Sequence, residues 1–260
     1  LVVDLLRRNL FGRAVSTGAA GQLENNRRLA RGVVTMPRLF GLPVTTSLFL
    51  TGSREKFTPV GANPFFEDVT ALSAEQRFRP ARQIAISYAY SLSRSHVFDP
   101  QPNPFLPALD LNSRIGRLTN TYAWDTRDDP ANATRGWFQS SGLELGTAAL
   151  GSDLRFIRYL GQQYYFKSVG PGLVLGSAFR LGAARDLDFD DLLQPAARFL
   201  AGGSTSVRGF AEDGLGDRSA FGGGNSLLLF NQELRFPIFK WARGVTFIDE
   251  PTDVIPMALL

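Results

Sequence analysis

The chain has 260 residues, no cysteine and a formal net charge of +4 at pH 7. Without cysteine it has neither a disulfide scaffold nor a thiolate metal site, and no apolar run approaches the roughly 18 residues that a membrane-spanning helix needs. The arginines are scattered through strand-like segments instead of being clustered, which argues against a nucleic-acid partner.

The first eleven residues do not have the pattern of a signal peptide. They carry charges at Asp4, Arg7 and Arg8 and lack a small-residue cleavage site. We therefore expect the chain to begin within a longer domain.

Alternation with a period of two residues is the dominant pattern, and it is clearest over residues 82–92. One face of this predicted strand is apolar and consists of Ile84, Ile86, Tyr88, Tyr90 and Leu92. The opposite face is small or polar and includes Ser87 and Ser91. Residues 173–181 and 135–147 repeat this division, with glycine and polar residues on one side. Such faces do not build the dry core of a soluble sandwich, but they are typical of a large barrel with a wet lumen and a lipid-facing exterior.

The same reasoning predicts twelve strands. In chain order, they cover residues 4–11, 13–24, 27–36, 43–53, 69–79, 81–95, 112–126, 135–149, 154–168, 172–185, 224–237 and 242–249. Every second connection is short, and the longer ones lie between them, notably 54–68, 98–111 and 185–223. Short turns on one rim and long loops on the other indicate an all-β fold, a transmembrane antiparallel β-barrel.

The longest connection contains the stretch FLAGGSTSVRGF, residues 199–210. Gly202 and Gly203 allow backbone conformations that side chains disfavour, and Arg208 follows between Val207 and Phe210. An arginine presented in this way favours an acidic partner. The alternative is a solvated loop with its arginine in water.

Four motifs in this order resemble the BamA/TamA outer-membrane assembly barrels, also called bacterial surface antigens: RRNLFGRA, WDTRDDPANATRGWF, FLAGGSTSVRGF and NSLLLFNQELRFPI. The resemblance implies a barrel of sixteen strands whose long loop enters the lumen, where its arginine meets acidic residues of the wall. The loop-motif residues are then Gly202, Gly203, Val207, Arg208, Gly209 and Phe210. Glu233 and Asp249 are the implied lumen-wall acidic partners.

Glu233 is expected to be the better of these two partners. By alternation it shares a face with Asn231 and Arg235, whereas Asp249 departs from the family's pattern because Glu250 and Pro251 follow it. Residues 1–260 are expected to form one barrel domain with about twelve of the sixteen strands, lacking the first and last strands and any POTRA domain.

The residues give little support to catalysis or metal binding. His96 is the only histidine and is interpreted as a surface-loop residue, and no serine stands in a nucleophile elbow. Asp125, Asp128 and Asp129 do not have the spacing of a calcium-binding EF-hand loop and are expected to cap backbone amides in a turn. No enzyme activity, metal or cofactor is predicted.

Several aromatic residues are interpreted as interfacial girdles: Trp124, Trp137, Tyr159, Tyr164, Tyr165 and Trp241. The predicted function, implied by the resemblance, is insertion and folding of client β-barrels in the bacterial outer membrane. The expected partners are unfolded outer-membrane proteins, the lipid bilayer and periplasmic POTRA domains of the complete protein. Two alternatives remain open, a two-partner secretion transporter and a passive porin.

Overall fold

The computed structural model describes residues 1–10, 12–39, 41–57, 64–100, 110–187, 198–203, 206–211, 214–216, 223–239 and 242–252. Within these ranges the chain forms one twelve-stranded sheet with its strands in sequence order. The strands are β1 (Val2–Leu10), β2 (Val15–Leu23), β3 (Arg27–Met36), β4 (Val44–Phe57), β5 (Phe65–Ala81), β6 (Ile84–Phe98), β7 (Asp110–Asp125), β8 (Gly136–Gly146), β9 (Phe156–Gly170), β10 (Leu173–Asp186), β11 (Ser226–Phe239) and β12 (Ala242–Thr252). A short 3-10 helix, η1 (Ala148–Leu150), follows β8. No helix among the described residues is long and apolar enough to cross a membrane.

All twelve predicted strands are present, and the main differences lie at their ends. Strands β4 and β5 extend further into the predicted connection 54–68 than the sequence pattern indicates. Cross-strand pairs account for the extension, because Arg54 donates to both carboxylate oxygens of Asp68 directly opposite it. The rings of Phe57 and Phe65 stack with centroids 5.1 Å apart at the end of the same ladder.

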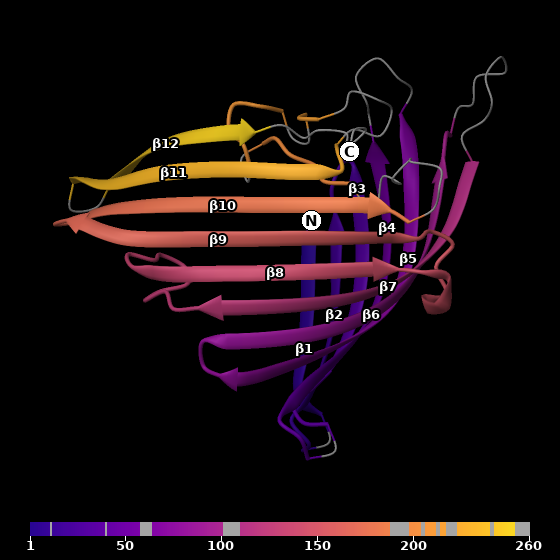
Figure 1. Ribbon diagram of the computed structural model, residues 1–260. Helices are drawn as coiled ribbons and strands as arrows, with labels where there is room; N and C mark the ends of the chain where they lie inside the picture. The colour runs from indigo at the N-terminus through magenta and orange to yellow at the C-terminus, as the bar shows by residue number, and fades with distance from the viewer. Residues whose placement is uncertain are drawn as a thin grey trace. The chain divides into compact units, whose positions relative to one another are not determined.

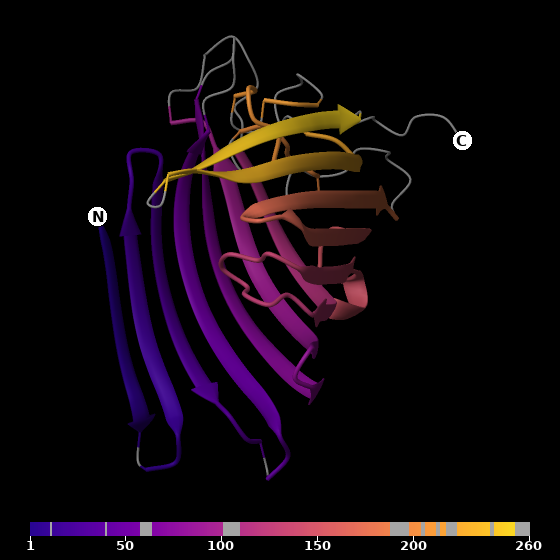
Figure 2. The ribbon, with the colours of Figure 1, turned by 90° about the vertical axis from the view of Figure 1, so that its left-hand side faces the viewer.

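The chain divides into two compact units, and the first comprises Leu1–Arg79, Ile86–Asn120 and Glu144–Arg155. In this unit β1 to β5 pair as successive antiparallel neighbours, with the first four strands lying side by side in Figure 2. Along β6, exposed Tyr88, Tyr90 and Leu92 alternate with half-buried Ser87 and Ser91. The predicted alternation of an apolar and a polar face is thus confirmed for this strand.

The interpretation of His96 as a loop residue was wrong, since it lies in β6. Its Nε2 is 2.9 Å from Oδ1 of Asp110, and its ring stacks on Phe98. The alternation did not reveal this extension of β6, because Arg94 interrupts the apolar face two residues after Leu92 and the polar Ser95 and His96 follow it.

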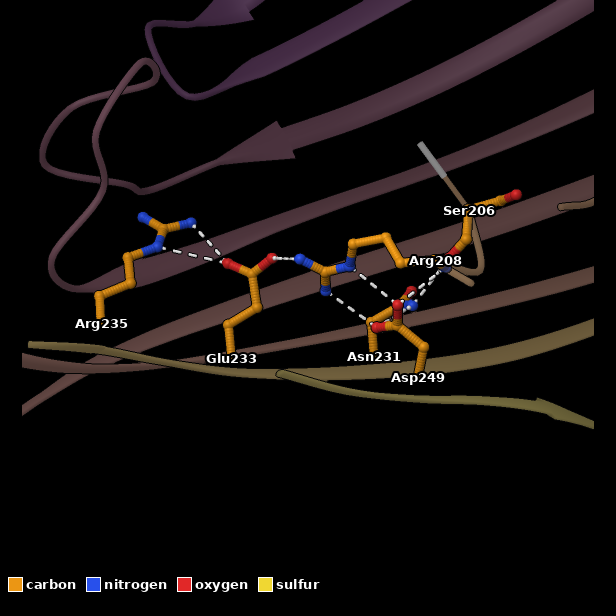
Figure 3. A network of polar contacts seen from close by, with 6 residues as sticks. All are labelled: Ser206, Arg208, Asn231, Glu233, Arg235 and Asp249. Carbon is orange, nitrogen blue, oxygen red and sulfur yellow. Dashed lines mark hydrogen bonds and ion pairs between the residues drawn. The ribbon is translucent and has the colours of Figure 1, made fainter. Parts of the chain in front are cut away.

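The second unit comprises Pro80–Ala85, Thr121–Leu143 and Phe156–Leu260. Its strands β9 to β12 pair in antiparallel order and lie side by side in Figure 1. Exposed Phe179, Leu181 and Phe230 lie on one face of this part of the sheet. The opposite face, called here the polar face, carries Asn231, Glu233, Arg235 and Asp249 (Figure 3).

The two adjacent tyrosines of β9, both interpreted as girdle residues, lie on opposite faces of the sheet. Tyr165 contacts the exposed Trp137, with ring centroids 4.4 Å apart. Tyr164 instead lines a hollow of the polar face together with Glu233 and Arg235, because successive residues of a strand point to opposite faces. Trp241 lies outside the described residues.

The connection between β7 and β8, residues 126–135, forms an ordered turn. Asp128 accepts hydrogen bonds from the backbone amides of Asp129, Thr134 and Arg135 and from the Thr134 hydroxyl. This agrees with the predicted role of its side chain as a cap of backbone amides. Gly136 ends the turn with φ +105°, where a Cβ would overlap the carbonyl of Thr126. The turn therefore has one well-defined backbone path.

We expect Asp128→Asn to loosen this turn at neutral pH. The hydrogen bond from the Thr134 hydroxyl, followed by those from the backbone amides, holds the pKa of Asp128 well below its usual range. Because the folded-state pKa is depressed, the stabilisation is present above about pH 4 and is lost as the pH falls through the folded-state value. Limited proteolysis of residues 126–135 in both proteins over a pH series should show a difference at pH 7 that shrinks in acid. A difference that stays constant down to the most acidic sample would contradict this assignment.

Candidate functional site

The described part of FLAGGSTSVRGF contains three glycines in the left-handed region. Gly202, Gly203 and Gly209 have φ values of +116°, +87° and +93°, which residues with a side chain rarely adopt. The hydroxyl of Ser206 accepts from the amide of Gly202 and donates to its carbonyl, at 2.8 and 2.7 Å. The described part of FLAGGSTSVRGF is therefore a compact turn stabilised by its own hydrogen bonds, as the paired glycines indicated.

The start of the FLAGGSTSVRGF stretch is held against β10. Phe199 is 2% exposed, and its ring fills the space above Gly182, where a Cβ would come within 2.7 Å of it. Its backbone exchanges two hydrogen bonds with Gly224, at 2.8 and 2.9 Å. Further along, the side chain of Val207 is fully buried. These contacts place the described part of FLAGGSTSVRGF on the polar face of the second unit.

Arg208 forms a paired contact with Asp249 of β12. Its Nε donates to Oδ2 at 2.8 Å and its Nη2 donates to Oδ1 at 2.9 Å, while its backbone amide donates to Oδ2 at 3.0 Å. This bidentate geometry is the one that a planar guanidinium favours with a carboxylate. The Asp249 side chain is only 3% exposed, so its negative charge is compensated by Arg208 and little by water.

Glu233 of β11 provides a second carboxylate. Nη1 of Arg208 donates to its Oε1 at 3.1 Å, and both side chains are between a quarter and a third exposed. The Arg208 guanidinium also lies 3.5 Å from the ring centre of Phe247, a cation–π contact that adds to the charge pairing. Figure 3 shows the arginine reaching from the loop between the two acidic side chains.

Asn231 joins the loop to the strands. Its Nδ2 donates to the carbonyl of Ser206 at 2.8 Å and to Oδ1 of Asp249 at 2.9 Å. Because Asn231 and Asp249 are directly opposite each other in the β11–β12 ladder, the side chain links both strands to the loop. The loop turn and its arginine are therefore fixed by separate contacts.

The structure brings together Arg208 and both acids that the resemblance implies, but in a different order of importance. Asp249 makes three contacts with Arg208, whereas Glu233 makes one. The expectation that Glu233 is the better partner is therefore wrong. Although Glu250 and Pro251 follow it, Asp249 lies within the β11–β12 ladder, opposite Asn231. Phe210 and Gly209 of the motif are exposed.

The sequence reasoning missed Phe247 as a residue of the site and gave no role to Asn231. Phe247 is two residues before Asp249, and Asn231 is two residues before Glu233. Side chains two positions apart on a strand share a face, so alternation from the two acids would have found both.

The site has the chemistry of a charge clamp. Its carboxylates are occupied by arginine and asparagine donors. Among the described residues, no group of three or more histidine, cysteine, aspartate or glutamate side chains could hold a metal ion. This arrangement can hold a loop onto a pair of strands. Detaching the loop costs the free energy of the Arg208 contacts.

Known proteins share this fold. The 14% identical BamA of Haemophilus ducreyi, solved without POTRA domains 1–3, superposes with a TM-score of 0.84 over 95% of this chain and 53% of its own. CdiB of Escherichia coli is 13% identical and superposes with a TM-score of 0.62 over 96% of this chain and 48% of its own. The predicted all-β barrel fold is thereby confirmed, with twelve antiparallel strands among the described residues.

A curated relative is closer in sequence. A SAM50-like protein of Schizosaccharomyces pombe is 34% identical over 128 residues, which are 47% of this chain and 27% of that protein. The chain thus spans about half the length of the solved structures and less of this relative. The Omp85 superfamily domain matches residues 9–253. Because this match covers nearly the whole sequence, the predicted resemblance is confirmed, and the chain belongs to the Omp85 superfamily.

Proposed function

We propose that this chain is the transmembrane barrel of an outer-membrane assembly machine that inserts and folds client β-barrel proteins. The single observation that carries the proposal is the clamp of Arg208 between Asp249 and Glu233 within an Omp85 domain. The clamp holds the described part of this loop against the polar face, and this attachment supports a role of the loop in the assembly machinery.

The proposed mechanism is strand templating. An exposed strand edge offers unpaired amides and carbonyls, and a client strand can satisfy them by adding to the sheet. Backbone pairing is required because the bilayer core offers no water to these groups. Pairing of this kind needs no catalytic residue, nucleotide or cofactor.

The proposed site of action is the bacterial outer membrane. An outer-membrane location agrees with the superfamily, and the similarity to a protein of Schizosaccharomyces pombe shows that related chains also occur outside bacteria. We propose unfolded outer-membrane proteins as clients and POTRA domains as further parts of the complete protein. The similarity to a BamA that was solved without its POTRA domains 1–3 supports the latter.

A transporter that exports one dedicated polypeptide is the second candidate, and the similarity to CdiB leaves it open. The two functions differ in the fate of the substrate. An assembly barrel delivers its client into the bilayer, whereas a transporter releases its polypeptide on the far side.

The experiment is reconstitution of the complete protein in liposomes with an unfolded β-barrel client. We expect the client to become protease-resistant and heat-modifiable faster than in liposomes without the protein, and Arg208→Ala to reduce this acceleration. Client released into the liposome lumen without insertion would instead support the transporter. A large, steady conductance in planar bilayers, with no effect on the client, would identify a porin.

A further inference from the structure

Glu233 has a second partner that the clamp alone does not explain. Its Oε1 accepts from Arg208, while its Oε2 accepts from Nη2 and Nε of Arg235 at 3.2 and 3.4 Å. Figure 3 shows the carboxylate between the two guanidinium groups. One acidic side chain therefore bridges the loop arginine and an arginine of its own strand.

The far end of Arg235 contacts a different part of the chain. Its Nη1 donates to the carbonyl of Ala133 at 3.4 Å, 102 residues away in the turn between β7 and β8. Ala133 is 3% exposed, and the guanidinium lies 5.2 Å from the ring centre of Phe166. All three nitrogens of Arg235 are thus used, two on Glu233 and one on the turn.

Hydrogen bonds within the turn hold the Ala133 carbonyl at a fixed place. Two residues suffice to join antiparallel strands, whereas the β7–β8 connection spans residues 126–135 and is organised around Asp128. Arg127 adds a paired contact with Asp125 and donates to the carbonyl of Pro130. Joining two antiparallel strands does not require so many hydrogen bonds within the connection.

We propose that Arg235 is a positioning residue: it holds Glu233 in place for Arg208 by using the β7–β8 turn as its support, so that the turn controls how firmly the loop is attached. The cluster contains two arginines and two carboxylates, and its charges balance. Without Arg235, one oxygen of Glu233 loses its donors and the partly exposed side chain is free to turn away from Arg208. This proposal deepens the proposed role of the clamp, but its test measures loop attachment and not assembly.

A lysine at position 235 separates positioning from simple charge compensation. Lysine keeps the charge, but its single ammonium group cannot reproduce the planar fork that reaches Glu233 and Ala133 together. If Arg235 served only to neutralise Glu233, Arg235→Lys would behave like the native protein. If it positions Glu233, the substitution should loosen the loop.

The chain has no cysteine, so a single introduced thiol can report on the loop. Val207→Cys places it at a fully buried position, where a maleimide reacts only when the loop detaches. In the complete protein in membranes, we expect Arg235→Lys to raise the labelling rate several-fold. Asp128→Asn should raise it as well, and the double variant should add little, because both changes act through one support.

Two controls make the result specific. Arg117→Lys alters an Arg–Glu pair of similar exposure in the first unit and should leave labelling at Val207→Cys unchanged. A thiol at Ser95, which is 5% exposed in the first unit, should stay unreactive in every variant, which shows that the barrel remains folded.

Native labelling in Arg235→Lys, together with fast labelling in Arg208→Ala, would overturn the positioning role and leave the clamp intact. Native labelling in both variants would instead refute the clamp on which the proposed function depends. Fully additive effects of Arg235→Lys and Asp128→Asn would remove the turn from the proposal.

Discussion

Alanine at position 208 is expected to destabilise the attached loop by about 3–5 kcal/mol, the usual cost of leaving a buried charge without its partner. Asp249 is the reason, since its side chain is only 3% exposed and receives three hydrogen bonds from Arg208. A solvated arginine would contribute about 1 kcal/mol or less. The size of the destabilisation caused by Arg208→Ala therefore distinguishes a buried clamp from a solvent-exposed ion pair.

A double-mutant cycle in the complete protein measures the two halves of the clamp separately. Arg208→Ala is combined with Asp249→Ala in one cycle and with Glu233→Ala in another, and loop attachment is scored by limited proteolysis. We expect the larger coupling energy with Asp249, because Glu233 makes a single contact with Arg208 and is more exposed. Arg208→Lys should lie between the native protein and the alanine variant, since lysine keeps the charge and loses the fork. Additivity in both cycles would mean that the loop is held by other contacts.

The second large effect is expected on the two faces of β6. A charge placed on the lipid-facing side of a barrel strand costs about 2–4 kcal/mol near the middle of the bilayer. Tyr88 is 56% exposed on the apolar face, whereas Ser87 next to it is half-buried on the other face. Tyr88→Arg should therefore destabilise the folded barrel, and Ser87→Arg should be tolerated better.

The comparison is made by unfolding the complete protein in denaturant from lipid vesicles. The two variants carry the same new charge at adjacent positions, so each is the control for the other. Equal losses of stability would show that β6 does not separate lipid from a polar interior, and the transmembrane assignment would lose its main support.

Local patterns were sufficient for the strands and for the orientation of their side chains. All twelve strands were predicted because alternation is a property of consecutive residues, and it placed Glu233 on one face with Asn231 and Arg235. It failed at strand ends such as that of β6, where His96 is polar and looks like a loop residue. The position of Arg208 beside two acids came from a resemblance between motifs, and no spacing in the sequence predicts it.

The sequence by itself determined the fold class, the strand order and the residues that a polar face would carry. Only the tertiary structure decided how that face is used. The ladder of β11 and β12 sets Asp249 opposite Asn231 and Glu233 opposite Phe247, which lets Asp249 reach both the backbone and the side chain of Arg208. The contact from Arg235 to Ala133 spans 102 residues. Such contacts depend on strand register and on the path of a turn, and these are fixed by the packing of distant segments, which no local pattern contains.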